Sequence, residues 1–284
     1  MQIAVIGPGG IGSTFAFQLA RAGHEVTVVA RGARLEQLRR DGAIITTDDE
    51  RAPVRVSGEL DADTDWDLVL VTVLVSEVDV LLAPLGRSAG KTVMFMFNTF
   101  DSLDRLRDAV GPQRFAFGFP ALMASVEDGK LSATIPRRGI TTTVNEPLWA
   151  KVFADAGIPA TVHDDMESWL RSHAALIVPL AIAGGMARRR RRGISWVEAG
   201  RLARATDEGF RLVRGLGNVI TPASVAMLAR LPVPVLAALL WVLTRVTVFT
   251  STIAAVPADE PGVLIDQMTA AAPGQTPELL AVRP

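Results

Sequence analysis

The spacing of apolar residues divides the chain into two parts. In the first part, short and mostly apolar runs of strand length alternate with segments of helical spacing; the runs cover residues 3–6, 25–30, 68–75, 91–97 and 114–119. Such runs are typical of parallel strands that are buried on both faces. Beyond Asp164 only helical spacing remains. The sequence therefore predicts an α/β domain over residues 1–163 and an all-helical domain over residues 164–284.

Turn and cap residues mark the boundaries of further elements. Asp128-Gly129 between two short alternating runs predicts a hairpin in the first domain. Ser195-x-x-Glu198 is a capping box, and Thr221-Pro222 predicts a helix with threonine as N-cap and proline at its first position. The expected helices run over about 166–186, 195–216, 221 onward, 234–255, 261–271 and 276 onward.

The glycine-rich stretch near the start of the chain carries the clearest functional motif. The first apolar run is followed at once by Gly7-x-Gly9-x-x-Gly12 and a helical pattern. In such a unit the first glycine permits a tight turn, the second lets a pyrophosphate approach the backbone, and the third lets helix and strand pack closely. The helix N-terminus attracts the phosphates. We expect a dinucleotide site formed by Gly7, Pro8, Gly9, Gly10, Ile11 and Gly12; the alternative is a glycine-rich turn in some other α/β protein.

The residue after the second strand indicates which dinucleotide is bound. An acidic residue there holds the 2′-hydroxyl of NAD, whereas arginine accommodates the 2′-phosphate of NADP. This position is Arg31, with Arg34 close by and no acid before Glu36. A guanidinium matches phosphate geometry bidentately. The sequence predicts NADP(H) as cofactor; the alternative is a solvated loop charge.

Composition removes several kinds of chemistry. The 284 residues are 49% hydrophobic with a net charge of −1, which describes a globular protein and gives no reason to expect a nucleic acid or a membrane as partner. Without cysteine, disulfides, thiolate metal sites and cysteine nucleophiles are excluded, and we expect no metal site. We see no signal peptide and expect a cytoplasmic protein. Arg188–Arg192 is interpreted as a solvated helix end, and the apolar stretch 236–243 as a core or homodimer-interface helix.

These features together resemble the ketopantoate reductase family. The residues that carry the resemblance are the glycine-rich turn, Arg31, Asn98 after the fourth strand and Trp169 at the entry to the helical domain. The resemblance covers nearly the whole chain. It implies a Rossmann-type dinucleotide-binding domain followed by a helical domain, within the 6-phosphogluconate dehydrogenase-like superfamily. It also implies reduction of 2-dehydropantoate to pantoate with NADPH.

The chain departs from that family where the family's catalytic residues stand. The family's third strand ends in a lysine that helps to hold cofactor or substrate, and Leu74 stands at that position here. The family's catalytic lysine follows two residues after the tryptophan, and Arg171 replaces it; Ala175 replaces the first of two asparagines. A late acidic residue of the family binds a substrate hydroxyl, and Glu260 is the nearest candidate.

Ketone reduction needs a hydride and a proton, and the available side chains limit the donor. Arginine stays protonated, so Arg171 can hold an anionic or carbonyl oxygen but is a poor acid. With no tyrosine in the chain, His173 is the preferred donor, although it lies about 200° round the helix from Arg171 and can equally be a structural histidine. Asn98 would orient substrate or nicotinamide. We expect an NADP-dependent oxidoreductase acting on a small carbonyl or hydroxy compound other than ketopantoate; the alternatives are a genuine 2-dehydropantoate 2-reductase and an inactive NADPH-binding or sensor protein.

Overall fold

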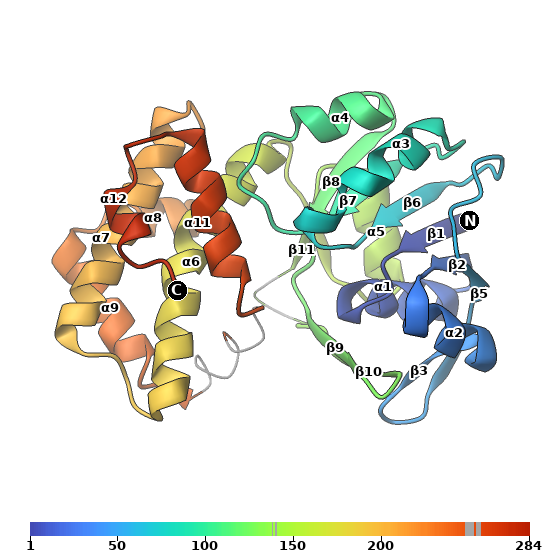
Figure 1. Ribbon diagram of the computed structural model, residues 1–284, viewed down its shortest axis with the longest axis horizontal. Helices are drawn as coiled ribbons and strands as arrows, with labels where there is room; N and C mark the ends of the chain where they lie inside the picture. The colour runs from blue at the N-terminus through green and yellow to red at the C-terminus, as the bar shows by residue number, and fades with distance from the viewer. Residues whose placement is uncertain (138, 140, 248–252, 254–256) are drawn as a thin grey trace. The chain divides into compact units, whose positions relative to one another are not determined.

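The computed structural model describes residues 1–137, 139, 141–247, 253 and 257–284. The chain forms two compact units (Figure 1). The N-terminal unit comprises Met1–Asn98 and Leu103–Met166, and the helical unit comprises Thr99–Ser102 and Glu167–Pro284. The expected α/β architecture with a helical C-terminal part is confirmed.

An eight-stranded sheet forms the centre of the N-terminal unit, in the order β12-β11-β8-β7-β6-β1-β2-β5. Every neighbouring pair is parallel except β8 and β11. The strands are β1 (Gln2–Ile6), β2 (Glu25–Val29), β5 (Arg55–Ser57), β6 (Leu68–Val71), β7 (Val93–Met96), β8 (Phe115–Phe119), β11 (Thr142–Val144) and β12 (Ala160–Val162). All residues of β6 and β7 are buried, as their apolar runs predict.

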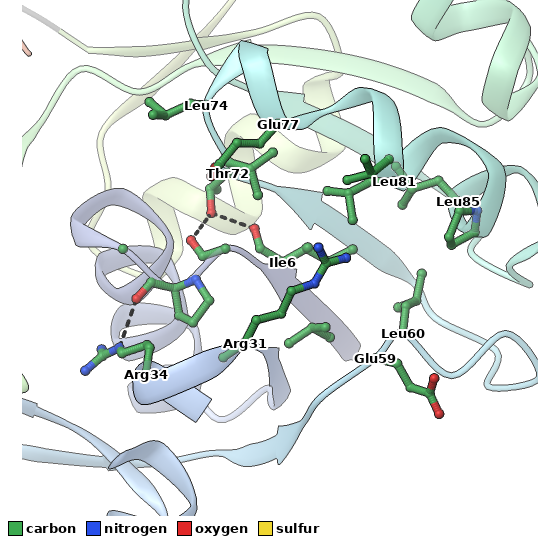
Figure 2. A pocket seen from close by; sticks show the side chains of 18 of the residues that line it. Ile6, Arg31, Arg34, Glu59, Leu60, Thr72, Leu74, Glu77, Leu81 and Leu85 are labelled. Carbon is green, nitrogen blue, oxygen red and sulfur yellow. Dashed lines mark hydrogen bonds between the residues drawn. The ribbon is translucent and has the colours of Figure 1, made fainter. Parts of the chain in front are cut away.

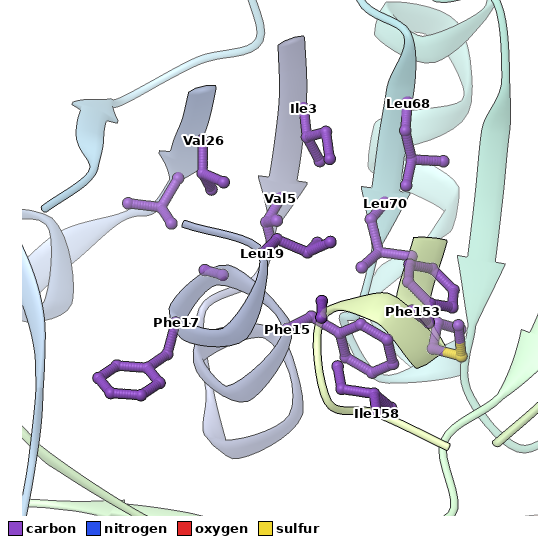
Figure 3. Close-up of a cluster of buried hydrophobic side chains, with 14 of the residues drawn as sticks. Ile3, Val5, Phe15, Phe17, Leu19, Val26, Leu68, Leu70, Phe153 and Ile158 are labelled. Atoms are coloured by element: carbon purple, nitrogen blue, oxygen red, sulfur yellow. The ribbon is translucent and has the colours of Figure 1, made fainter. Parts of the chain in front are cut away.

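Helices cover this sheet and close its core. They are α1 (Gly10–Arg21), α2 (Gly32–Asp41), α3 (Asp79–Arg87), α4 (Asp104–Val110) and α5 (Pro147–Asp155), with a 3₁₀ turn η1 at Val75–Glu77. Phe15 and Leu19 of α1 are fully buried in the cluster that contains Val5 of β1 (Figure 3). Phe15 meets Phe153 of α5 edge to face, with 5.0 Å between ring centroids. This packing fixes the start of α1 against the end of β1, where the glycine-rich turn lies.

A second, four-stranded sheet lies against α1. Its order is β4-β3-β10-β9, and its strands are β3 (Ala43–Thr46), β4 (Arg51–Pro53), β9 (Met123–Glu127) and β10 (Lys130–Thr134). β9 and β10 pair antiparallel, which confirms the predicted hairpin. Asp128 and Gly129 form its turn with positive φ angles of 50° and 81°. The hairpin brings backbone carbonyl groups close to α1 and α2.

The helical unit is built from α6 (Met166–Arg190), α7 (Trp196–Gly215), α8 (Ala223–Leu228), α9 (Val233–Leu243), α11 (Glu260–Ala271) and α12 (Pro277–Leu280). The capping box at the start of α7 is confirmed, because Ser195 Oγ accepts from the Glu198 amide while Glu198 accepts from the Ser195 amide. By length and composition α6 could cross a membrane, yet half of its apolar window is buried inside the protein.

Two predicted helix boundaries are wrong. Pro222, rather than Thr221, is the N-cap of α8, because its backbone is extended, with φ −68° and ψ 177°, and the helix begins only at Ala223. The helix expected over 234–255 ends at Leu243, since Thr244 Oγ1 donates back to the Trp241 carbonyl and closes the last turn. Residues 248–252, 254 and 255 of that expected helix lie outside the described residues.

Candidate functional site

Two glycines make the turn between β1 and α1 possible. Gly7 has a φ angle of +84°, and a Cβ atom there would lie 2.7 Å from Val73 Cγ1. A Cβ atom on Gly12 would lie 2.3 Å from Thr72 Oγ1. The Thr72 hydroxyl lies within hydrogen-bond distance of the Ile6 and Gly7 carbonyl groups, at 2.9 and 2.8 Å. The ends of β1 and β6 are thus tied together directly beneath the turn.

Gly9 differs from its neighbours because its side-chain position is open. A Cβ atom on Gly9 would meet no atom within 4 Å, whereas one on Gly10 would lie 2.3 Å from the Ala124 carbonyl oxygen of β9. Gly9 is the N-cap of α1, and in the described part of the chain no side chain caps this helix. The first amides of a helix have no intrahelical acceptor, so an uncapped N-terminus can bind an anion. The turn is closed on one side by β9 and open on the other.

Arg34 is a structural part of the turn, which sequence reasoning did not reveal. Its Nε and Nη2 donate to the Pro8 carbonyl at 3.1 Å and to Ser13 Oγ at 2.8 Å. Its Nη1 donates to the Gly129 carbonyl at 3.1 Å. Burial lowers the pKa of this guanidinium from its usual value, partly opposed by the charge of Asp41. Arg34 therefore connects the glycine-rich turn to the β9–β10 hairpin.

Arg31 remains available to a ligand. It is the second residue after the buried end of β2 and is exposed. Among the described residues its guanidinium has no hydrogen-bond or ion-pair partner. Figure 2 shows the Arg31 side chain directed across the cavity, whereas Arg34 turns back to the Pro8 carbonyl. Arg34 also lines the cavity, but its three guanidinium nitrogens already donate to protein acceptors, so Arg31 is the better placed of the two to meet a phosphate.

A cavity of about 1050 Å³ lies over the glycine-rich turn. This volume is at the upper end for small-molecule sites and is large enough for a dinucleotide. The residues lining it all belong to the N-terminal unit and include every predicted cofactor residue except Gly12 and Asn98: Gly7, Pro8, Gly9, Gly10, Ile11, Arg31 and Leu74. Leu74 is 55% exposed just before η1. Glu59, Glu77 and Arg87 also line the cavity, and Asn98 is partly buried after the end of β7.

Arg171 holds the helical unit together. It is 9% exposed, and its Nε donates to the Phe100 carbonyl at 3.2 Å. Its Nη1 donates to Asn218 Oδ1 at 2.6 Å and pairs with Glu167 Oε1 at 2.8 Å. The Phe100 amide in turn donates to Gln267 Oε1 at 2.8 Å. The backbone carbonyl and amide of the buried Phe100 are thus both hydrogen-bonded to side chains, those of Arg171 and Gln267. The sequence does not reveal these two bonds, because the partners lie far apart along the chain.

His173 and Glu260 lie on α6 and at the start of α11. The His173 ring stacks on Trp169 with 5.2 Å between centroids and 8° between planes. Removal from water lowers the pKa of His173 to about 4. The imidazole is therefore neutral at pH 7, and burial disfavours its protonated form. Glu260 is partly buried at the first position of its helix.

Comparison with known proteins gives one family and one fold. Residues 3–141 match the model of the family described as ketopantoate reductase PanE/ApbA. The 2-dehydropantoate 2-reductase of Vibrio cholerae serotype O1 (strain ATCC 39315 / El Tor Inaba N16961) is 31% identical over 138 residues. That match covers 48% of this chain and 42% of the Vibrio enzyme, less than half of that relative's length.

Solved structures resemble the chain over its full length. A PanE/ApbA family ketopantoate reductase from Ralstonia eutropha JMP134 superposes with a TM-score of 0.73 at 21% identity, over 100% of this chain and 96% of that one. A D-mandelate dehydrogenase, solved with NADH and anilino(oxo)acetate, gives a TM-score of 0.68 at 14% identity over 100% and 96%. At these identities the likeness establishes the fold.

Proposed function

We propose that the protein is an NADP-dependent oxidoreductase. The proposal starts from the premise that residues 3–141 of this chain belong to the ketopantoate reductase PanE/ApbA family. The protein would transfer hydride between NADPH and a small carbonyl or hydroxy compound. The observation that carries the proposal is the cavity over an uncapped helix N-terminus, with the exposed Arg31 directed across it. This arrangement suits a phosphorylated dinucleotide.

The residues present fit that cofactor. The open side of Gly9 and the first amides of α1 would take the pyrophosphate, since no side chain of the turn occupies that space. Arg31 would take the 2′-phosphate, and Arg34, which also lines the cavity, would keep the turn in shape. Leu74, in the place of the family's lysine, would offer only apolar contact. When bound, the cofactor supplies the hydride.

The choice between NADPH and NADH depends on two opposed charges. Arg31 favours a 2′-phosphate, whereas Glu59, on the loop after β5, would repel that phosphate and could accept hydrogen bonds from a ribose. A dehydrogenase of the same fold was solved with NADH, so the fold itself does not exclude that cofactor. We favour NADPH because Arg31 lies two residues after the end of β2, where this fold meets the adenosine ribose.

Toward the substrate, we propose that Asn98 orients the reacting group and that Arg171 holds an anionic or carbonyl oxygen. Nε and Nη1 of Arg171 are engaged in the described structure, which leaves Nη2 for a ligand. His173 would exchange the proton, and its lowered pKa means that the protonated imidazole would release its proton readily to a carbonyl oxygen. Glu260 would accept a hydrogen bond from a substrate hydroxyl. Because Leu74 and Arg171 replace the family's lysines, ketopantoate is not our first choice of substrate.

A second candidate is a protein that binds NADPH without turning it over. The hydrogen bonds of Arg171 to Phe100 and Asn218 favour it, because they describe a structural arginine. The third candidate is a genuine 2-dehydropantoate 2-reductase. In each case the glycine-rich turn would hold the same cofactor.

One experiment separates these candidates. The purified chain is mixed with NADPH and a panel of 2-oxo acids, ketones and aldehydes that includes ketopantoate, and the loss of NADPH absorbance is followed. Turnover with another carbonyl compound supports the first candidate, and turnover with ketopantoate alone supports the reductase. Binding of NADPH without turnover in either direction supports the second. Failure to bind NADPH or NADH contradicts all three.

A further inference from the structure

One end of the helical unit concentrates positive charge. Residues Arg188–Arg192 end α6 and form the turn after it, and all five are exposed. Arg190 Nη1 pairs with Glu198 Oε1 at 2.6 Å. Among the residues that the structure describes, the side chains of the other four have no ion-pair or hydrogen-bond partner. The run is therefore a dense and largely uncompensated patch, even though the whole chain has a net charge of −1.

Exposed apolar side chains adjoin this patch. Trp196 and Val197, in the first turn of α7, are 55% and 65% exposed. The end of α9 also reaches the turn, because Arg245 Nη2 donates to the Ile194 carbonyl at 3.2 Å. The Arg245 guanidinium lies 3.5 Å above the Trp241 ring.

Helix α9 is apolar on both its faces. Leu236, Ala237 and Leu240 are buried in a cluster with residues of α6 and α7. On the outside, Val235, Leu239 and Val242 are 42%, 40% and 52% exposed at a spacing of four and three residues, which places them on one helix face. Residues 231–244 contain no charged side chain. A helix of this kind is expected in contact with a further apolar phase on its outer face.

We propose that this end of the helical unit, here called the basic–apolar end, docks on an anionic lipid surface. The basic–apolar end consists of Arg188–Arg192, Trp196, Val197 and the outer face of α9. Interfacial binding uses this combination, with arginines on the headgroups and Trp, Leu and Val at the boundary with the acyl chains. The protein would lie on the surface without crossing it, because half of the apolar window of α6 is already buried.

Charge complementarity favours an anionic lipid surface, rather than a second copy of this chain, as the partner of the basic–apolar end. A second copy docked through this same surface would bring five more arginines into the interface, whereas an anionic surface neutralises the five that are present. The sequence-based expectation of no membrane partner rested on the net charge of the whole chain. A net charge does not show where on the surface the charges lie, so it does not reveal a local cluster of arginines. The proposal does not depend on the cofactor or the substrate.

The test uses the full chain and sedimentation with vesicles. Wild type is expected to bind vesicles of phosphatidylcholine mixed with phosphatidylglycerol, to bind phosphatidylcholine alone far more weakly, and to dissociate as sodium chloride is raised. Each arginine near such a surface contributes a factor of roughly five, so replacing four with glutamine should weaken partitioning by several hundredfold. The variant carries Arg188→Gln, Arg189→Gln, Arg191→Gln and Arg192→Gln.

Matched variants keep the outcome decisive. The charge control replaces four exposed arginines of the N-terminal unit and should bind vesicles nearly as wild type does: Arg21→Gln, Arg39→Gln, Arg40→Gln and Arg55→Gln. Leu239→Gln should weaken vesicle binding while the circular dichroism spectrum is kept. Equal weakening by both arginine sets, or no preference of wild type for anionic vesicles, overturns the proposal. So does a dimer in sedimentation velocity that Leu239→Gln dissociates while vesicle binding is unchanged.

Discussion

Replacing Gly9 with alanine separates cofactor binding from folding. A Cβ atom on Gly9 meets no atom within 4 Å, and the residue has a φ angle of −72° that alanine adopts readily. Gly12 offers no such test, because its Cβ atom would lie 2.3 Å from Thr72 Oγ1 and would disturb the fold itself. The new methyl group should therefore leave the protein folded and occupy the space through which the pyrophosphate approaches.

The expected size of the effect follows from the bonds that the methyl group prevents. A hydrogen bond between a backbone amide and a charged phosphate is worth about 1.5–3 kcal/mol, so the loss of one weakens NADPH binding roughly 10- to 150-fold. Stability should stay equal or rise, since alanine at a compatible position stabilises by about 0.4–1 kcal/mol through the unfolded state.

The assay is calorimetric titration with NADPH together with a thermal melt. Gly215→Ala is the matched control, because a Cβ atom there also meets nothing within 4 Å. It should leave NADPH binding unchanged, and its stability should stay equal or rise as for Gly9→Ala, since Gly215 lies in helix α7. An alanine at Gly9 that binds NADPH as tightly as wild type would refute the reasoning, because the phosphates then do not pass over this residue.

Three further substitutions test the other parts of the account. Arg34→Met removes the bonds to Pro8 and the hairpin turn, so it should weaken NADPH and NADH by the same factor and lower the unfolding free energy by about 1–3 kcal/mol in urea titrations; a selective loss of NADPH would contradict this. Arg171→Met should lower the unfolding free energy by about 2–4 kcal/mol, because a buried carbonyl and a carboxylate lose their donor; an unchanged urea midpoint would show that the guanidinium is not structural. The lowered pKa of His173 means that the unfolded chain binds the extra proton first, so stability is kept above about pH 6.5 and is lost as the pH falls toward about 4. His173→Phe should flatten this dependence in urea midpoints measured across that range, and an unchanged slope would place its origin elsewhere.

The local signals in the sequence predicted most of the N-terminal unit. Apolar runs gave β1, β6 and β7, and the glycine spacing placed the turn over which the cavity lies. The capping box also located the start of α7, because both of its hydrogen bonds are made within four residues. Elements whose stabilising contacts are made between residues close together along the chain can be predicted from the sequence alone.

What the sequence could not show are contacts between residues far apart along the chain. From the sequence Arg34 was only a second arginine close to Arg31, whereas in the structure its guanidinium donates to the carbonyl groups of Gly129 and Pro8. Arg171 looked like a substitute for a catalytic lysine, and its bond to Phe100 spans 71 positions. The helix predicted to run to 255 ended early because Thr244 bonded back to its own last turn, which apolar periodicity does not register.

The central claim is that Arg31 and the glycine-rich turn hold NADPH in the N-terminal unit. Its most direct test is titration of wild type and Arg31→Ala with NADPH and with NADH. We predict that the substitution weakens NADPH roughly 10- to 150-fold, because a charge-assisted contact to the 2′-phosphate is lost, and leaves NADH within about twofold. Equal losses for the two cofactors, or no binding of either to the wild-type chain, would contradict it.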